Sequence, residues 1–166
     1  MNRGVERTRQ LLLSGLMLLL LLGCAATNNV VSVPESKPWS NDAQKRRDLM
    51  VGKWLGEVPG EHGLRLTLIE RNENGTYRLT FRSYKGARYE ESVEVGLWGV
   101  SGSIYFTIMR GWIKEGEFVP ADSTRAYFYD AYNISRLSSI TLEFESLDSG
   151  HRFTNRRVGN DFQFSD

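Results

Sequence analysis

The stretch LRLTLIERNENGTYRLTFRSY, residues 64–84, decides the fold class. Apolar residues alternate with polar ones on both sides of Asn74-Gly75, which is the pattern of half-buried β-strands. An Asn-Gly pair between two such runs is the strongest short signal for a β-hairpin, because both residues tolerate positive φ. The stretch therefore predicts two antiparallel strands joined by a tight turn.

The same pattern continues along the chain to residue 158. Segments rich in Val, Ile, Tyr, Phe and Thr are separated by turn signals such as Lys85-Gly86, Ser101-Gly102 and Asp148-Ser149-Gly150. We expect strands at residues 49–58, 63–71, 75–84, 88–100, 103–112, 124–134, 138–146 and 150–158, with one long loop at 113–123 and a short helix at 41–48 before the first strand.

This arrangement predicts an all-β fold. Links of hairpin length and an apolar face on each strand favour an eight-stranded antiparallel up-and-down barrel, which leaves no exposed strand edge. A two-sheet sandwich is the alternative, and a parallel α/β fold is excluded because no long helix alternates with the strands. The residues expected to face inward are Leu64, Leu66, Leu68, Tyr77, Leu79, Phe81, Val93, Val95, Leu97, Ile104, Phe106, Ile108, Ile140, Leu142 and Phe144; Arg65, Thr67, Arg78, Arg82, Glu94, Glu143 and Glu145 are expected to face outward.

Residues 1–23 have the character of a signal peptide. Arg3, Arg7 and Arg9 precede an almost pure leucine run at residues 11–22, which is too short to cross the roughly 30 Å hydrocarbon core of a bilayer. Leu21-Leu22-Gly23-Cys24 resembles the lipobox of bacterial lipoproteins, which implies cleavage before Cys24 and attachment of acyl chains, including palmitate, to that residue. Because the chain has no other cysteine, no disulfide is expected in the folded domain.

The mature chain is expected to consist of the lipidated Cys24, a tether at residues 24–39 and a folded domain at residues 40–166. Two or more acyl chains make a stable membrane anchor. Ala25, rather than Asp, follows the cysteine, and the resemblance to sorted lipoproteins implies the periplasmic face of the outer membrane in the cell envelope. The whole chain carries a formal net charge of +1, which the loss of Arg3, Arg7, Arg9 and Glu6 makes slightly negative, so nucleic acid is not expected as a partner.

The two ends of the predicted barrel resemble those of the lipocalin superfamily. Gly52-Lys53-Trp54 begins the first strand and Arg156-Arg157 ends the last. In lipocalins a G-x-W motif closes one end of the barrel, and an arginine of the last strand packs over the tryptophan. The resemblance covers residues 40–158 and implies that Gly52, Trp54 and either Arg156 or Arg157 close the barrel. Tyr129-Asp130-Ala131-Tyr132 departs from the family's middle T-D-Y motif, which indicates a diverged member.

The sequence offers few groups for catalysis. His62 lies in a Gly-rich turn and His151 follows another, so both are expected in solvent. The spacing of ligands that a zinc site requires is missing, as are a nucleophile elbow, a P-loop and a dinucleotide-binding motif. We therefore expect no catalytic residues, no metal site, no cofactor and no enzymatic activity.

One aromatic stretch, residues 110–132, is the candidate binding region. It combines the long loop with residues suited to contacting a ligand: Arg110, Trp112, Tyr127, Tyr129, Asp130 and Tyr132. An apolar pocket with a few polar groups is typical of small-molecule sites, so the first hypothesis is a binding module for a small apolar or amphipathic ligand. The alternative is a filled barrel that presents this stretch to an envelope protein, as an assembly factor or inhibitor.

Overall fold

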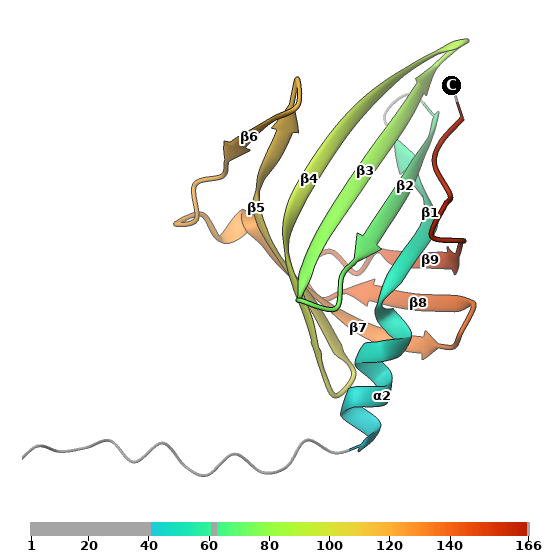
Figure 1. Cartoon of the computed structure of the whole chain (residues 1–166), viewed down its shortest axis with the longest axis vertical. Helices are drawn as coiled ribbons and strands as arrows, with labels where there is room; N and C mark the ends of the chain where they lie inside the picture. Colours follow the sequence, from blue (N-terminus) through green and yellow to red (C-terminus); the bar gives the residue numbers. More distant parts are fainter. Residues whose placement is uncertain (1–40, 61–62, 166) are drawn as a thin grey trace, which may run out of the picture. The chain divides into compact units, whose positions relative to one another are not determined.

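The computed structural model describes residues 41–60 and 63–165 (Figure 1). The predicted signal peptide, Cys24, the tether and His62 lie outside the described residues. Among the described residues, no helix is long and apolar enough to span a membrane.

The described domain is an antiparallel barrel closed by eight strands, as the sequence predicts. The elements are α2 (Asn41–Met50), β1 (Gly52–Gly60), β2 (Gly63–Arg71), β3 (Thr76–Lys85), β4 (Arg88–Ser101), β5 (Ile104–Lys114), β6 (Glu117–Pro120), the 3₁₀ helix η2 (Ala126–Phe128), β7 (Tyr129–Leu137), β8 (Thr141–Ser146) and β9 (Arg152–Arg157). Each barrel strand pairs with the next, β5 pairs with β7, and β9 pairs back to β1. β6 pairs only with β5 and extends that strand outside the ring.

Two segments differ from the sequence prediction. The expected loop at residues 113–123 contains the β5–β6 hairpin, whose turn places Glu115 and Gly116 at positive φ. The expected strand at residues 124–134 begins only at Tyr129, because residues 126–128 form a turn of 3₁₀ helix. Tyr127 and Phe128 therefore do not alternate across a strand.

The inward faces of three strands were predicted wrongly. In β2 the buried residues are Thr67, Ile69 and Arg71, whereas Leu64 is 51% exposed. In β5 they are Tyr105, Thr107 and Met109, whereas Phe106 is 37% exposed; in β4 they are Gly96 and Trp98, whereas Leu97 is 41% exposed. The prediction holds for Tyr77, Leu142 and Phe144, which are buried, but not for Ile140, which is 68% exposed in the turn before β8.

The turn between β2 and β3 explains the error in β2. Asn72 N–H donates to the carbonyl of Thr76 at 2.9 Å, so Glu73, Asn74 and Gly75 form a three-residue loop with Gly75 at φ +85°. A two-residue turn at Asn74-Gly75 would place Leu68 opposite Phe81. The longer loop shifts the pairing by one residue and places Thr67 there, and such a shift moves every side chain of one strand to the other face.

The end of the barrel next to α2 is filled by side chains. Met50 and Trp54 are fully buried, and Trp98 and Leu142 join them in one apolar cluster. The Trp54 ring N–H donates to the carbonyl of Met50 at 3.0 Å. This end is a closed floor.

The strands extend unequally away from this floor. β3 and β4 remain paired as far as Lys85 and Arg88, whereas β7 pairs with β5 only from Ile104 to Ile108. β1 and β9 pair only over Trp54, Leu55 and Gly56. Figure 1 shows β3 and β4 rising past the short strands β7, β8 and β9, which lie near α2. The wall is therefore complete near the floor and incomplete in the other half, which we call the open half.

The chain after β9 runs along the outer face of the first strands. Lys53 donates to the carbonyl of Phe162 at 3.0 Å, and Arg82 donates to the carbonyl of Ser165. The Arg82 guanidinium lies 3.8 Å from the ring centre of Tyr89 and 4.8 Å from that of Phe164. These contacts explain why Arg82 is buried although it lies outside the barrel.

Candidate functional site

The interior of the barrel contains ionisable side chains from five strands. They include Arg65 and Arg71 of β2, Tyr77 of β3, Glu94 of β4, Tyr105 of β5 and Asp130 of β7. The strand register places these side chains on the inward face, because directly paired residues share a face. Tyr77 pairs with the buried Arg71, and Asp130 pairs with the buried Thr107. The open half of the interior is therefore more polar than the apolar pocket with a few polar groups that the sequence predicted.

The charge of Asp130 acts on the Glu94 carboxylate across the barrel. Burial raises the pKa of Glu94, the negative charge of Asp130 raises it further, and Arg65 opposes the shift. Desolvation also raises the pKa of Asp130, although a hydrogen bond with Thr107 stabilises its carboxylate. Both groups therefore hold a proton at a higher pH than an ordinary carboxyl does.

Arg65 is close enough to Glu94 for its positive charge to act on that carboxylate. Its guanidinium carbon is 4.4 Å from the ring centre of Phe81, so the side chain stacks on the inner wall. Its Nε atom is buried and has no hydrogen-bond partner. Because a buried charged donor without an acceptor is costly, this N–H is a binding group that the described chain leaves unused.

Arg71 lies deeper and is 1% exposed. Its Nε donates to the hydroxyl of Tyr105 at 3.3 Å, and its guanidinium lies 4.6 Å from the ring centre of the same tyrosine. Its Nη1 is buried without a partner. The two inward arginines of β2 thus each keep an unsatisfied donor inside the barrel.

Aromatic rings form the opposite wall. Tyr132 stacks on Tyr105 with ring centres 5.2 Å apart, and Phe144 contacts both rings edge to face. Phe153 stacks on Phe144 at 5.0 Å. Burial raises the pKa of the Tyr132 hydroxyl, and the charge of Asp130 adds to that effect. The barrel interior therefore combines an apolar aromatic wall with polar groups at its open half.

The six residues proposed from the sequence fall into separate groups. Asp130 and Tyr132 are on the inward face of β7, where Tyr132 is partly buried and Asp130 is exposed in the open half. Tyr127 is 83% exposed and Tyr129 is 49% exposed, with its hydroxyl donating to the carbonyl of Ser123 at 2.9 Å. Arg110 is exposed. It pairs with no residue of β4, because the β4–β5 register shifts at this position. Trp112 packs edge to face on the buried Phe128 at 5.7 Å.

Sequence reasoning missed Arg65, Arg71 and Glu94. Arg65 and Glu94 were expected to face solvent, because charged residues in strands with alternating polarity normally do. The signal that could have found Arg71 is the hairpin loop, because a three-residue connection places Arg71 opposite Tyr77.

The floor brings together the residues of the lipocalin resemblance. The Arg157 guanidinium lies 4.3 Å from the ring centre of Trp54, whereas Arg156 is exposed. Arg157 also donates to the carbonyls of Val51 and Ser139 at 2.7 Å, and to that of Leu49. Gly52 has φ +103°, and a Cβ there would lie 2.8 Å from Arg157 Nη1. The arginine thus ties the end of α2 to both the first and the last strand.

Among the described residues, no three His, Cys, Asp or Glu side chains are grouped so that they could hold a metal ion. His151 is exposed. Comparison of the sequence with models of known protein families and with curated proteins gives no match.

Proposed function

We propose that this chain is a non-catalytic binding module, anchored to a membrane of the cell envelope, whose barrel holds a small amphipathic ligand. The polar end of the ligand is an anionic group that accepts hydrogen bonds from Arg65 in the open half. Its apolar part packs against the rings of Tyr132, Phe144 and Phe153.

The observation that carries this proposal is the pair of unused arginine donors. Arg65 Nε and Arg71 Nη1 are buried and lack an acceptor. A charge-assisted hydrogen bond from a guanidinium to a carboxylate or phosphate is among the stronger polar contacts, and an apolar ligand without such a group would leave both donors unsatisfied.

The test measures binding of a fluorescent fatty acid, which has a carboxylate and an apolar chain. The mature chain, residues 24–166, would carry Cys24→Ser so that no acyl group is attached. We expect saturable binding that unlabelled fatty acid displaces. We also expect native mass spectrometry to detect a co-purified ligand that solvent extraction removes.

Two variants locate the binding site. Arg65→Gln keeps polar character but removes the cation, and we expect the affinity to fall about tenfold or more, since a charge-assisted hydrogen bond contributes about 1.5 to 3 kcal/mol. Arg78→Gln removes an exposed cation from the outer face of β3 and is the matched control. Equal binding by both variants, or no binding by the parent chain, would refute the proposed ligand site.

The anchor is a separate part of the proposal. It rests on Leu21-Leu22-Gly23-Cys24, and Ala25 supports placement at the periplasmic face of the outer membrane. Labelling of cells with radioactive palmitate should mark the chain, and Cys24→Ser should abolish both the label and membrane association. A chain that is labelled equally after this substitution would show that Cys24 is not the attachment site.

One observation favours the alternative, a component that faces another envelope protein. Tyr127 is 83% exposed, Phe118 is 54% exposed and Tyr129 is 49% exposed, all on the segment from β6 to β7. Aromatic side chains are enriched in protein interfaces. A photocrosslinker at Tyr127 in intact cells should capture one protein if this function holds, whereas a crosslinker at Ile140, which is 68% exposed, should not. Capture of no protein at Tyr127 would count against it.

A further inference from the structure

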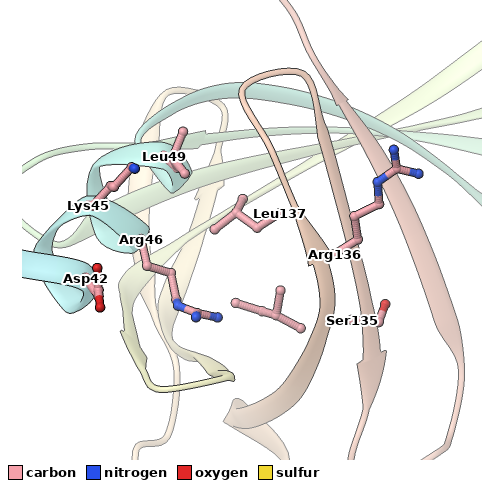
Figure 2. Close-up of a pocket in the computed structure, with 8 residues that line it drawn as sticks. Asp42, Lys45, Arg46, Leu49, Ser135, Arg136 and Leu137 are labelled. Atoms are coloured by element: carbon pink, nitrogen blue, oxygen red, sulfur yellow. The ribbon is translucent and has the colours of Figure 1, made fainter.

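A cleft of about 410 Å³ lies between α2 and β7, at the closed end of the barrel. Its lining includes Lys45, Arg46 and Leu49 of the helix and Arg136 and Leu137 of the strand. Figure 2 shows the Arg46 side chain extending across the cleft toward β7, whereas Arg136 points away from it. The cleft is separate from the ionisable cluster in the open half.

The charge of the cleft is positive. Arg136 is 3.5 Å from Glu143 and is therefore neutralised locally. Lys45 and Arg46 have no carboxylate within ion-pair distance in the part of the chain that the structure describes, and Asp42 is the acidic residue among the lining side chains. Two helix cations lie on one side of a cleft that extends to the apolar side chains of Ile134 and Leu137, and this arrangement is suited to an anion with an apolar continuation.

The bottom of the cleft is apolar and can contact such a continuation. Leu49, Ile134 and Leu137 line it, and Ile134 belongs to the apolar cluster of the barrel. A free inorganic anion would use the cations and leave these side chains uncovered. A phospholipid would contact the cations with its phosphate and the leucines with the first methylene groups of an acyl chain, so the lining matches a phospholipid better than a bare phosphate.

The position of the cleft also favours a membrane as the source of the anion. Residues 25–40 connect Cys24 to the first residue of α2, and a fully extended chain of that length reaches on the order of 55 Å. The cleft therefore stays within reach of a bilayer that holds the acyl chains of Cys24. β3 and β4 extend the opposite way, so a membrane at the cleft leaves the open half accessible from solution (Figure 1).

We propose that the cleft between α2 and β7 binds the anionic headgroup of a membrane phospholipid through Lys45 and Arg46, and so orients the barrel with its open half away from the bilayer. The choice of a membrane rests on the proposed anchoring at Cys24. The headgroup contact itself requires neither the acyl chains nor a ligand in the barrel.

The test uses residues 24–166 with Cys24→Ser, so that failure of the headgroup site and failure of lipid attachment remain distinguishable. Binding to phosphatidylcholine vesicles with and without phosphatidylglycerol is measured by co-sedimentation. The cleft variant is Lys45→Gln/Arg46→Gln. The matched control is Lys85→Gln/Arg88→Gln, which removes the same charge from the β3–β4 turn at the far end of the barrel.

We expect binding only to vesicles that contain phosphatidylglycerol. The cleft variant should bind about thirty-fold more weakly, because each basic side chain near an anionic surface contributes about a factor of five, and the control should bind as the parent does. No binding by the parent chain, or an equal loss in both variants, would overturn the proposal, since the second result indicates attraction by overall charge alone.

A single-cysteine label identifies the contacted surface and the source of the anion. Cys24 is the chain's only cysteine, so Ser135→Cys in the Cys24→Ser background carries a fluorophore at the cleft, and Ser92→Cys carries one in the open half. Vesicles should change the emission of the Ser135 label and not that of the Ser92 label. A response of the Ser135 label to glycerol phosphate but not to vesicles would overturn the assignment to a membrane lipid.

Discussion

The guanidinium of Arg157 lies 4.3 Å from the ring centre of Trp54 and joins the last strand of the barrel to the first. The same group donates to the carbonyls of Leu49, Val51 and Ser139. Three carbonyls from the end of α2 and the β7–β8 connection are therefore satisfied by one side chain. Closure of the barrel and attachment of the helix depend on the same residue.

Arg157→Ala should destabilise the domain strongly. The substitution removes a cation–π contact and leaves half-buried carbonyls without donors, so we expect the free energy of unfolding to fall by about 2 to 4 kcal/mol. Urea unfolding followed by tryptophan fluorescence measures it. Arg156→Ala removes the exposed neighbouring arginine and should cost less than about 0.5 kcal/mol. Similar losses in the two variants would contradict the closing role of Arg157.

Gly52→Ala tests the close approach of the same arginine. An added Cβ would meet Arg157 Nη1 at 2.8 Å and would adopt a φ of +103°. Gly63 has a similar φ of +125° but open space around it, so Gly63→Ala measures the backbone cost alone. Thermal unfolding should place Gly52→Ala below Gly63→Ala, each losing about 1 kcal/mol or more. A smaller loss at Gly52 would mean that Arg157 adapts without cost.

Arg47→Ala should loosen α2. Arg47 donates to the carbonyl of Glu73 at 2.6 Å, and its guanidinium lies 5.0 Å from the ring centre of Trp98. Losing both contacts should cost about 1 to 2 kcal/mol and should raise amide hydrogen exchange in the helix before it rises in the barrel. Asp48→Ala, on the exposed face of the same helix, is the comparison. Uniform exchange changes in both variants would disagree with this attachment.

The architecture could be predicted from the sequence, whereas the content of the interior could not. Alternation and turn spacing indicate the number of barrel strands and their order. They do not reveal which of two faces is buried when both carry large side chains, as in β2, where leucines alternate with Arg65 and Arg71. The face depends on the length of the Asn72–Thr76 turn, and both possible lengths contain Asn74-Gly75.

The candidate site was predicted only in part for the same reason. Asp130 and Tyr132 belong to a strand that was recognised, although it begins later than expected. Glu94 lies on a strand that was also recognised, but its charge suggested solvent. Glu94 comes near Asp130 because β5 pairs with both β4 and β7, a strand arrangement that the residue pattern of β4 alone does not reveal.

Glu94→Gln should make the domain more stable at neutral pH. Burial and the charge of Asp130 raise the pKa of Glu94 in the folded protein. Between the ordinary carboxyl pKa of about 4 and the raised value, the folded state binds more protons than the unfolded chain, so the free energy of unfolding falls as pH rises. The variant should lack this part of the decline, and Glu57→Gln, on the outer face, should retain it. Urea unfolding across the pH range measures both; identical profiles would contradict an interior position of Glu94.

Arg71→Met separates stability from binding. The variant loses the hydrogen bond to Tyr105 and a cation–π contact, but it also removes a buried charged group whose Nη1 has no partner. Replacing a buried charge by an apolar side chain of similar volume is often neutral, so we expect the free energy of unfolding to change by less than about 1.5 kcal/mol. If the unused donor serves a ligand anion, fatty-acid binding should weaken while the fold persists. A loss of several kcal/mol would instead make Arg71 a structural cation, because its charge would then be satisfied within the folded chain.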